Sequence, residues 1–162
     1  MMHKFKFYSL AGWMMVFLMA CDKSDSARPN DLEYIGFGTF YGYCIGETCI
    51  ELFRLEADKL WENISDPYPQ SGQPVTGEYV ELSAAQFERV KDLISPPSAA
   101  LLAVSDSVIG MPDYTDGGGV YLEYKSGTTH RFWLIDNWLM NVPEAHHELV
   151  GRIHEAVALI NE

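Results

Sequence analysis

Basic residues are scarce in this sequence. Its 162 residues include 11 Lys and Arg against 23 Asp and Glu, which gives a formal net charge of −12. Proteins that bind nucleic acids need clustered Lys and Arg to contact phosphates, so we expect no nucleic-acid partner. A hydrophobic content of 48% with 21% charged residues is typical of a folded chain. A chain of this length most often forms one domain.

A membrane-spanning run is also lacking. The apolar stretch at residues 7–20 carries no charge, but a helix needs roughly 20 such residues to cross the hydrocarbon core. Lys4 and Lys6 precede this stretch, and small residues end it. A positive head followed by a short apolar run is typical of a secretory signal peptide. A buried N-terminal helix is the alternative.

The end of that stretch, Leu18-Met19-Ala20-Cys21, resembles a lipobox, the processing signal of bacterial lipoproteins. The resemblance implies cleavage between Ala20 and Cys21, a diacylglycerol on the Cys21 thiol and acylation of the new amino terminus. An ordinary cleavage site, with Cys21 as merely a small residue, is the alternative. We therefore expect the lipid bilayer to hold the chain through acylated Cys21, in the bacterial cell envelope and facing the periplasm. Asp22 resembles a retention signal of the inner membrane.

The predicted organisation has three parts. Residues 1–20 are the signal peptide, residues 21–33 are the lipidated cysteine and a flexible tether, and residues 34–162 are a single globular domain. The ten polar residues after Cys21 average about 15–20 Å end to end as a coil. Cleavage removes two lysines and no acid, so anionic headgroups repel the mature domain and the lipid must hold it.

Cysteine is rare too, since Cys21, Cys44 and Cys49 are the only three. With Cys21 lipidated, an even pair remains in an oxidising compartment, where such pairs form disulfides. Closing the short loop between Cys44 and Cys49 would stabilise the fold by roughly 2 kcal/mol. A metal-binding pair is the alternative, although no second cysteine pair is present to complete such a site.

The apolar pattern predicts an α+β fold. A capping box at Ser83 and Gln86 begins a helix that ends before Pro96, and a second, amphipathic helix runs from near Pro143 to the end. A two-residue turn at Ser126-Gly127 joins a hairpin. We expect an antiparallel sheet of about five strands covered on one face by two helices. The predicted strands are residues 34–43, 49–55, one beginning at 60–61, 120–125 and 128–134, with an irregular loop at 64–77.

The loop at residues 110–119 is the sharpest candidate site. Asp113 and Asp116, followed by Gly117 and Gly118, offer oxygen ligands of the kind that calcium prefers. Their spacing lacks the alternating pattern of known calcium loops. The alternative is that the aspartates bond their own backbone while the glycines adopt positive φ. A small divalent-metal-binding protein or metal-dependent enzyme that uses this loop is therefore our second functional hypothesis.

Three motifs together resemble a family of uncharacterised bacterial proteins, many of them lipoproteins. The matching pieces are the Cys44–Cys49 segment before an early strand, the helix from Ser83, and the D-x-x-D-G-G-type loop from Asp113 to Gly118. The family pattern has Pro after the second cysteine, where this chain has Ile50. The resemblance covers most of residues 34–160 and implies no particular activity.

The remaining candidate groups have ordinary structural explanations. His147 and His154 are seven residues apart on the last helix, whereas helical zinc ligands usually lie about four apart; His146 lies at the edge of its apolar stripe. We expect Glu123 and His130 to face each other across the hairpin, where the pair can move protons or merely stabilise the strands. With no catalytic constellation, we expect a non-enzymatic domain that binds a ligand or an envelope protein and needs no cofactor. The aromatic residues that offer a stacking face, but are expected mostly in the core, are Tyr41, Tyr43, Trp61, Phe132, Trp133 and Trp138.

Overall fold

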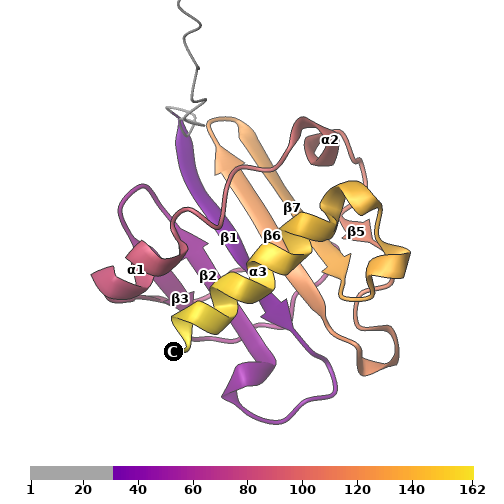
Figure 1. Cartoon of the computed structure of the whole chain (residues 1–162), viewed down its shortest axis with the longest axis horizontal. Helices are drawn as coiled ribbons and strands as arrows, with labels where there is room; N and C mark the ends of the chain where they lie inside the picture. The colour runs from indigo at the N-terminus through magenta and orange to yellow at the C-terminus, as the bar shows by residue number, and fades with distance from the viewer. Residues whose placement is uncertain (1–30) are drawn as a thin grey trace, which may run out of the picture.

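The computed structural model describes residues 31–162, which form a seven-stranded sheet with helices on one face (Figure 1). The strand order is β4-β3-β2-β1-β6-β7-β5, and every neighbouring pair is antiparallel except β5 and β7. The strands are β1 (Leu32–Phe40), β2 (Ile50–Leu55), β3 (Leu60–Asn63), β4 (Tyr79–Glu81), β5 (Val108–Ile109), β6 (Gly119–Ser126) and β7 (Thr129–Asp136).

Three α-helices complete the fold, and the longest, α3 (His147–Ile160), crosses one face of the sheet (Figure 1). α1 (Ala84–Val90) begins at the predicted capping box, and α2 (Ala99–Leu102) is a single turn. The main core lies between this face and the helices, with Phe37 and Trp133 at its centre. Short 3-10 turns are η1 (Glu47–Cys49), η2 (Tyr114–Asp116), η3 (Leu139–Asn141) and η4 (Glu144–His146).

The α+β class is confirmed, but the prediction of about five antiparallel strands with two helices is wrong. The sheet has seven strands and is mixed, and three helices are present among the described residues. The additional strands, β4 and β5, are only three and two residues long, and α2 has four. Such short elements show no measurable periodicity, so pairing with neighbours rather than local pattern determines them.

The hairpin of β6 and β7 forms in a different register from the one expected. Ser126 pairs with Thr129, so the two-residue turn is Gly127-Thr128, with Gly127 at φ +51°. Glycine at the first central position is typical of one of the two favoured hairpin turns. The register therefore moves by two residues, and Glu123 pairs with Phe132 instead of His130. A shift of two keeps each side chain on its face of the sheet.

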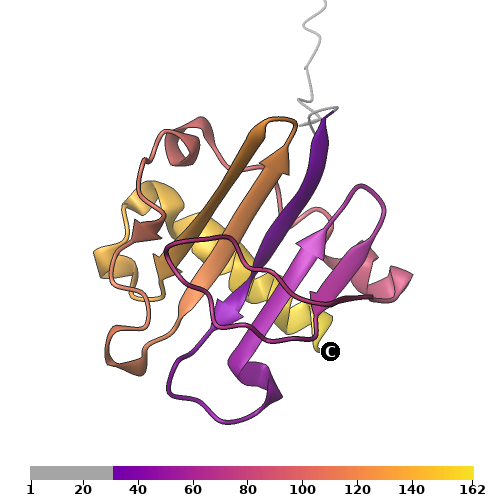
Figure 2. The ribbon, with the colours of Figure 1, turned by 180° about the vertical axis from the view of Figure 1, so that it is seen from behind.

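The other face of the sheet is covered only in part. Figure 2 shows the segment between β3 and β4 running across this face. Val75 of that segment packs in a second, smaller apolar cluster with Phe40, Leu52, Tyr121 and Leu134. The predicted irregular loop is thus a partial cover over the sheet, and it leaves an opening on one side of the cluster.

The predictions about the three cysteines have different outcomes. The Cys44–Cys49 disulfide is confirmed, with the two Cα atoms 5.5 Å apart. The signal peptide, the cleavage site at Ala20 and Cys21, and nearly all of the tether lie outside the described residues. Among residues 31–162, no helix combines the length and the hydropathy needed to cross a bilayer.

Candidate functional site

The opening beside the β3–β4 segment is a depression with a volume of about 500 Å³. Five side chains of the sheet line it: Tyr34, Arg54, Tyr79, Glu123 and His130. Residues 73–77 of the covering segment form its remaining wall. The volume lies within the range of small-molecule sites, so this depression is the candidate functional site.

Glu123 is the buried centre of the site, with a residue exposure of 1%. Its Oε1 accepts hydrogen bonds from the Tyr34 hydroxyl at 2.8 Å and from His130 Nε2 at 2.6 Å. Its Oε2 accepts a bond from the Tyr121 hydroxyl at 2.8 Å. A buried carboxylate is tolerated only when such donors replace water. Three donors therefore hold Glu123 in one position below the opening.

Glu123 in turn fixes the orientation of His130. An ionised carboxylate only accepts hydrogen bonds, so Nε2 of His130 carries the proton in this contact, and Nδ1 is the ring nitrogen that does not bond Glu123. The His130 side chain is 37% exposed, whereas that of Glu123 is 2% exposed. The predicted contact between these residues is present, although it is diagonal across the hairpin rather than directly opposite.

Arg54 faces the same depression from β2. Its guanidinium carbon lies 4.0 Å from the centre of the Tyr34 ring and 4.1 Å from that of the Tyr79 ring. Its Nε is buried without a hydrogen-bond partner. Within residues 31–162, Arg54 forms no ion pair. The two rings thus hold a positive charge whose hydrogen-bonding groups the described chain does not use.

Gly36 makes the floor between Arg54 and Glu123, because it pairs with Arg54 on one side and with Glu123 on the other. A Cβ at this position would lie 3.0 Å from the Glu123 Cβ and 3.1 Å from its Oε2. The absence of a side chain at Gly36 therefore lets Glu123 lie close to the backbone of β1. Any side chain here would press on the buried carboxylate.

The Tyr34 and Tyr121 hydroxyls stay protonated at neutral pH. Burial and the nearby Glu123 carboxylate raise the pKa of Tyr34 well above its usual value. Burial and Glu123 raise the pKa of Tyr121 further. The Tyr121 oxygen also accepts a hydrogen bond from the Val75 backbone at 3.0 Å. One hydroxyl therefore connects the covering segment to Glu123.

The predicted Asp113 loop does not line this depression. Asp113 accepts hydrogen bonds from the Tyr68 hydroxyl at 2.6 Å and from the Gly118 backbone at 3.0 Å. Burial would raise the pKa of Asp113, but these bonds and the Gly42 backbone outweigh it and hold the pKa below its usual value. Gly118 has positive φ, and so do Asp113 and Asp116 themselves, whereas Gly117 does not.

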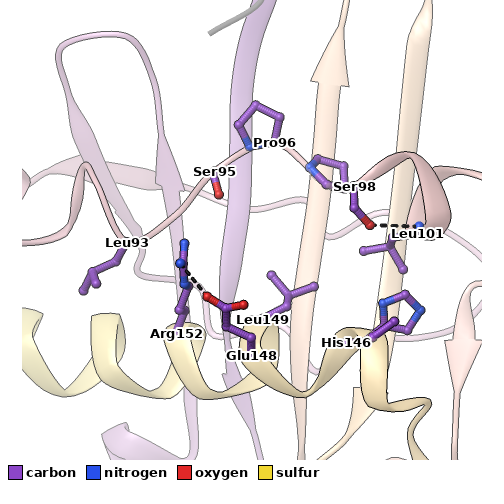
Figure 3. Close-up of a pocket in the computed structure, with 11 residues that line it drawn as sticks. Leu93, Ser95, Pro96, Ser98, Leu101, His146, Glu148, Leu149 and Arg152 are labelled. Carbon is purple, nitrogen blue, oxygen red and sulfur yellow. Dashed lines mark hydrogen bonds and ion pairs between the residues drawn. The ribbon is translucent and has the colours of Figure 1, made fainter. Parts of the chain in front are cut away.

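The three predicted histidines of the last helix do not converge. His146 is 5% exposed and lines a second depression of about 190 Å³, beside the ion pair of Arg152 and Glu148 (Figure 3). His147 Nε2 donates to the Val142 carbonyl at 2.8 Å. His154 donates to Asn137 at 3.0 Å, and burial lowers its pKa. Across residues 31–162, no three His, Cys, Asp or Glu side chains are grouped closely enough to hold a metal ion.

Sequence reasoning identified Glu123 and His130 but missed most of their partners. The expectation that the six aromatic residues lie mostly in the core is wrong: Trp133 alone among them is buried, Tyr43 and Trp138 are exposed, and the other three are half-buried. Tyr34 and Arg54 were not candidates. Their position on one face follows from the strand register, which the glycine alternation in β1 could have indicated.

Comparison with known proteins adds no assignment. No family model matches the chain, and neither a curated protein nor a solved structure shows significant similarity to it. The expected relationship to uncharacterised bacterial lipoproteins stays a prediction, and the function has to be argued from the site alone.

Proposed function

We propose that this chain is a lipoprotein of the bacterial envelope, anchored through acylated Cys21, whose domain binds a small organic anion in the depression without transforming it. The observation that carries the binding proposal is the unpaired Arg54 guanidinium between the Tyr34 and Tyr79 rings. The lipobox-like segment supports the anchor.

A carboxylate is the chemical group that Arg54 fits best. Guanidinium groups bind carboxylates through two parallel hydrogen bonds, and aromatic rings that fix the guanidinium reduce the entropy lost on binding. The chain has a net charge of −12, yet the positive charge of Arg54 forms no ion pair within the described residues, and this calls for an explanation. An anionic ligand supplies one.

The second polar group of the ligand would meet His130. Glu123 holds its ring so that Nδ1 is the nitrogen left for a ligand. Among the described residues, no serine, threonine or cysteine side chain is hydrogen-bonded to His130. A nucleophile activated by this histidine is therefore missing from the site, which favours binding over catalysis.

The binding proposal is tested with acetate, benzoate and phenylacetate against the purified full chain in detergent, by calorimetry. We expect a carboxylate to bind, and Arg54→Gln to weaken it at least tenfold because the charge and the paired hydrogen bonds are lost. Arg89→Gln, at an exposed position on α1, is the matched control. Equal binding of benzylamine, or unchanged binding by Arg54→Gln, would contradict the proposal.

The anchor is tested separately by the intact mass of the membrane-extracted protein and by fatty-acid labelling. We expect a mass that corresponds to acylation at Cys21 and the loss of residues 1–20. Cys21→Ser should abolish the label, whereas Cys44→Ser should retain it. Labelled protein from the Cys21→Ser variant would refute the anchor and leave the binding proposal standing.

A further inference from the structure

Exposed apolar side chains are concentrated at one end of the sheet. Of eleven large hydrophobic residues exposed in the described chain, seven lie on the segments 41–46, 110–118 and 137–141, which we call the distal loops. The seven are Tyr43, Ile45, Met111, Tyr114, Trp138, Leu139 and Met140. Large apolar side chains exposed on neighbouring loops are typical of interaction sites.

A buried carboxylate ties two of the distal loops together. Asp136 Oδ2 accepts bonds from the Met111 backbone at 2.9 Å and from Asn141 Nδ2 at 2.7 Å, while Oδ1 accepts one from the Trp138 backbone at 2.8 Å. Asn137 Nδ2 donates to the Gly117 carbonyl at 2.9 Å. The apolar side chains are therefore presented by fixed backbone, which lowers the entropic cost of binding.

The third distal loop, 41–46, lies against segment 110–118. A Cβ on Gly42 would contact the Asp113 carboxylate, and a Cβ on Gly118 would contact the Tyr41 ring. The Cys44–Cys49 disulfide closes the same loop. Segment 110–118 therefore connects the other two distal loops, and the surface that the three present lies beyond the end of β1 at Phe40.

The charge of this surface is entirely of one sign. The distal loops contain no Lys or Arg, and they contain Asp113 and Asp116. The lowered pKa of Asp113 keeps its carboxylate charged at neutral pH. A second copy of this chain would bring the same acids together, and anionic headgroups would repel them. The surface therefore favours an occupant with positive charge around an apolar centre.

The position of the tether also indicates what can cover the distal loops. Residue 31 precedes β1, whereas the distal loops begin after β1 ends at Phe40 (Figures 1 and 2). Nine strand residues span about 30 Å. Under the proposed Cys21 anchor, the distal loops therefore lie at the end of β1 that is farther from the anchored tether.

We infer that the distal loops dock onto a second envelope protein, at an apolar surface of that protein bordered by Lys and Arg. This interaction is distinct from ligand binding in the depression. The aromatic and methionine side chains supply the contact area, and the two aspartates pair with the basic border. The direction of the surface and the location of the partner in the envelope rest on the proposed anchor, whereas the docking contact itself does not.

The test places the photoreactive residue p-benzoyl-phenylalanine at Met140, which is 86% exposed, in the full chain expressed in its native cells. Val80 on β4, 45% exposed and outside the distal loops, is the control position. We expect an adduct with one other protein from position 140 and none from position 80. The crosslinked peptide, mapped by mass spectrometry, should be apolar with Lys or Arg nearby.

Two variants then test the chemistry of the contact. Asp116→Asn keeps a residue that tolerates left-handed φ and removes the charge, and we expect it to lower the adduct yield at least threefold. Tyr114→Ser should lower the yield at least fivefold, whereas Ile64→Ser, also exposed but outside the distal loops, should not change it. An adduct of two copies, a crosslinked peptide without basic residues, or no protein adduct at all would each overturn the inference.

Discussion

The hydroxyl of Tyr121 is the point at which the architecture of the site can be tested most sharply. It donates to Glu123 at 2.8 Å and accepts from the Val75 backbone at 3.0 Å, and both groups are buried. Tyr121→Phe removes this single oxygen and leaves the ring in place. The variant therefore deprives a buried carboxylate of a donor and a buried N–H of its acceptor in one step.

The expected loss can be estimated from these two bonds. A hydrogen bond to a charged group contributes about 1.5–3 kcal/mol, and an unsatisfied buried N–H costs about 1–3 kcal/mol. Tyr121→Phe should therefore reduce the free energy of unfolding by about 3–5 kcal/mol. Tyr34→Phe removes only one bond to Glu123, at a partly exposed position, so we expect about 1–2 kcal/mol because water replaces part of the interaction.

Urea unfolding of the purified protein, followed by circular dichroism, measures these differences. Tyr114→Phe is the matched control, because Tyr114 is 66% exposed, and its loss should stay below about 0.5 kcal/mol. The reasoning requires the order Tyr121→Phe, Tyr34→Phe, Tyr114→Phe, from largest to smallest loss. A Tyr121→Phe variant as stable as Tyr114→Phe would show that the covering segment is not held through this hydroxyl.

Three further predictions concern other parts of the chain. Cys44→Ser should lower the free energy of unfolding by about 2 kcal/mol, since the disulfide closes a loop between residues five apart, and reduction of the wild type should have the same effect in the same urea assay. The pKa values of Tyr34, Tyr68 and Tyr121 are raised in the folded state, so their contribution to stability is complete below the unfolded-state pKa near 10 and is lost as the pH rises above it. Absorbance at 295 nm should show these three tyrosines ionising only when the protein unfolds. Ionisation of all nine tyrosines before unfolding would contradict this. Arg54→Met should change the free energy of unfolding by less than about 1 kcal/mol, because the lost ring contacts are offset by removal of an unpaired buried Nε; a loss above about 3 kcal/mol would make Arg54 a structural residue.

The sequence predicted those parts of the fold that local pattern controls. The capping box at Ser83 begins α1 as expected, the Cys44–Cys49 pair forms a disulfide, and the last helix ends with the chain. What it could not predict depends on long-range pairing. β5 is two residues beside β7, and no local signal distinguishes such a bridge from coil. The turn at Gly127-Thr128 differs by one residue from the predicted one, because the two candidate turns share the same glycine.

Some residues of the candidate site could likewise be predicted from local sequence, and others could not. Glu123 and His130 were identifiable because a hairpin places them near each other under either register. Arg54 and Tyr34 come from strands far away in sequence, and Gly36 separates Arg54 from Glu123. Only the full order of the strands brings these groups to one depression. The Asp113 loop attracted attention through composition, yet its carboxylate bonds Tyr68, a residue in the segment between β3 and β4.

The residues that line this depression are of two kinds: those around Glu123 stabilise the fold, whereas Arg54 is suited to binding a ligand. The Tyr34 and Tyr121 hydroxyls and Nε2 of His130 all bond Glu123, so these contacts are explained by the structure of the domain. Arg54 differs, because its Nε is buried without a hydrogen-bond partner and it forms no ion pair within the described chain. Folding alone would favour an apolar side chain at this position. Arg54 is held by two tyrosine rings beside the oriented His130, and binding of a ligand explains its presence better than folding does.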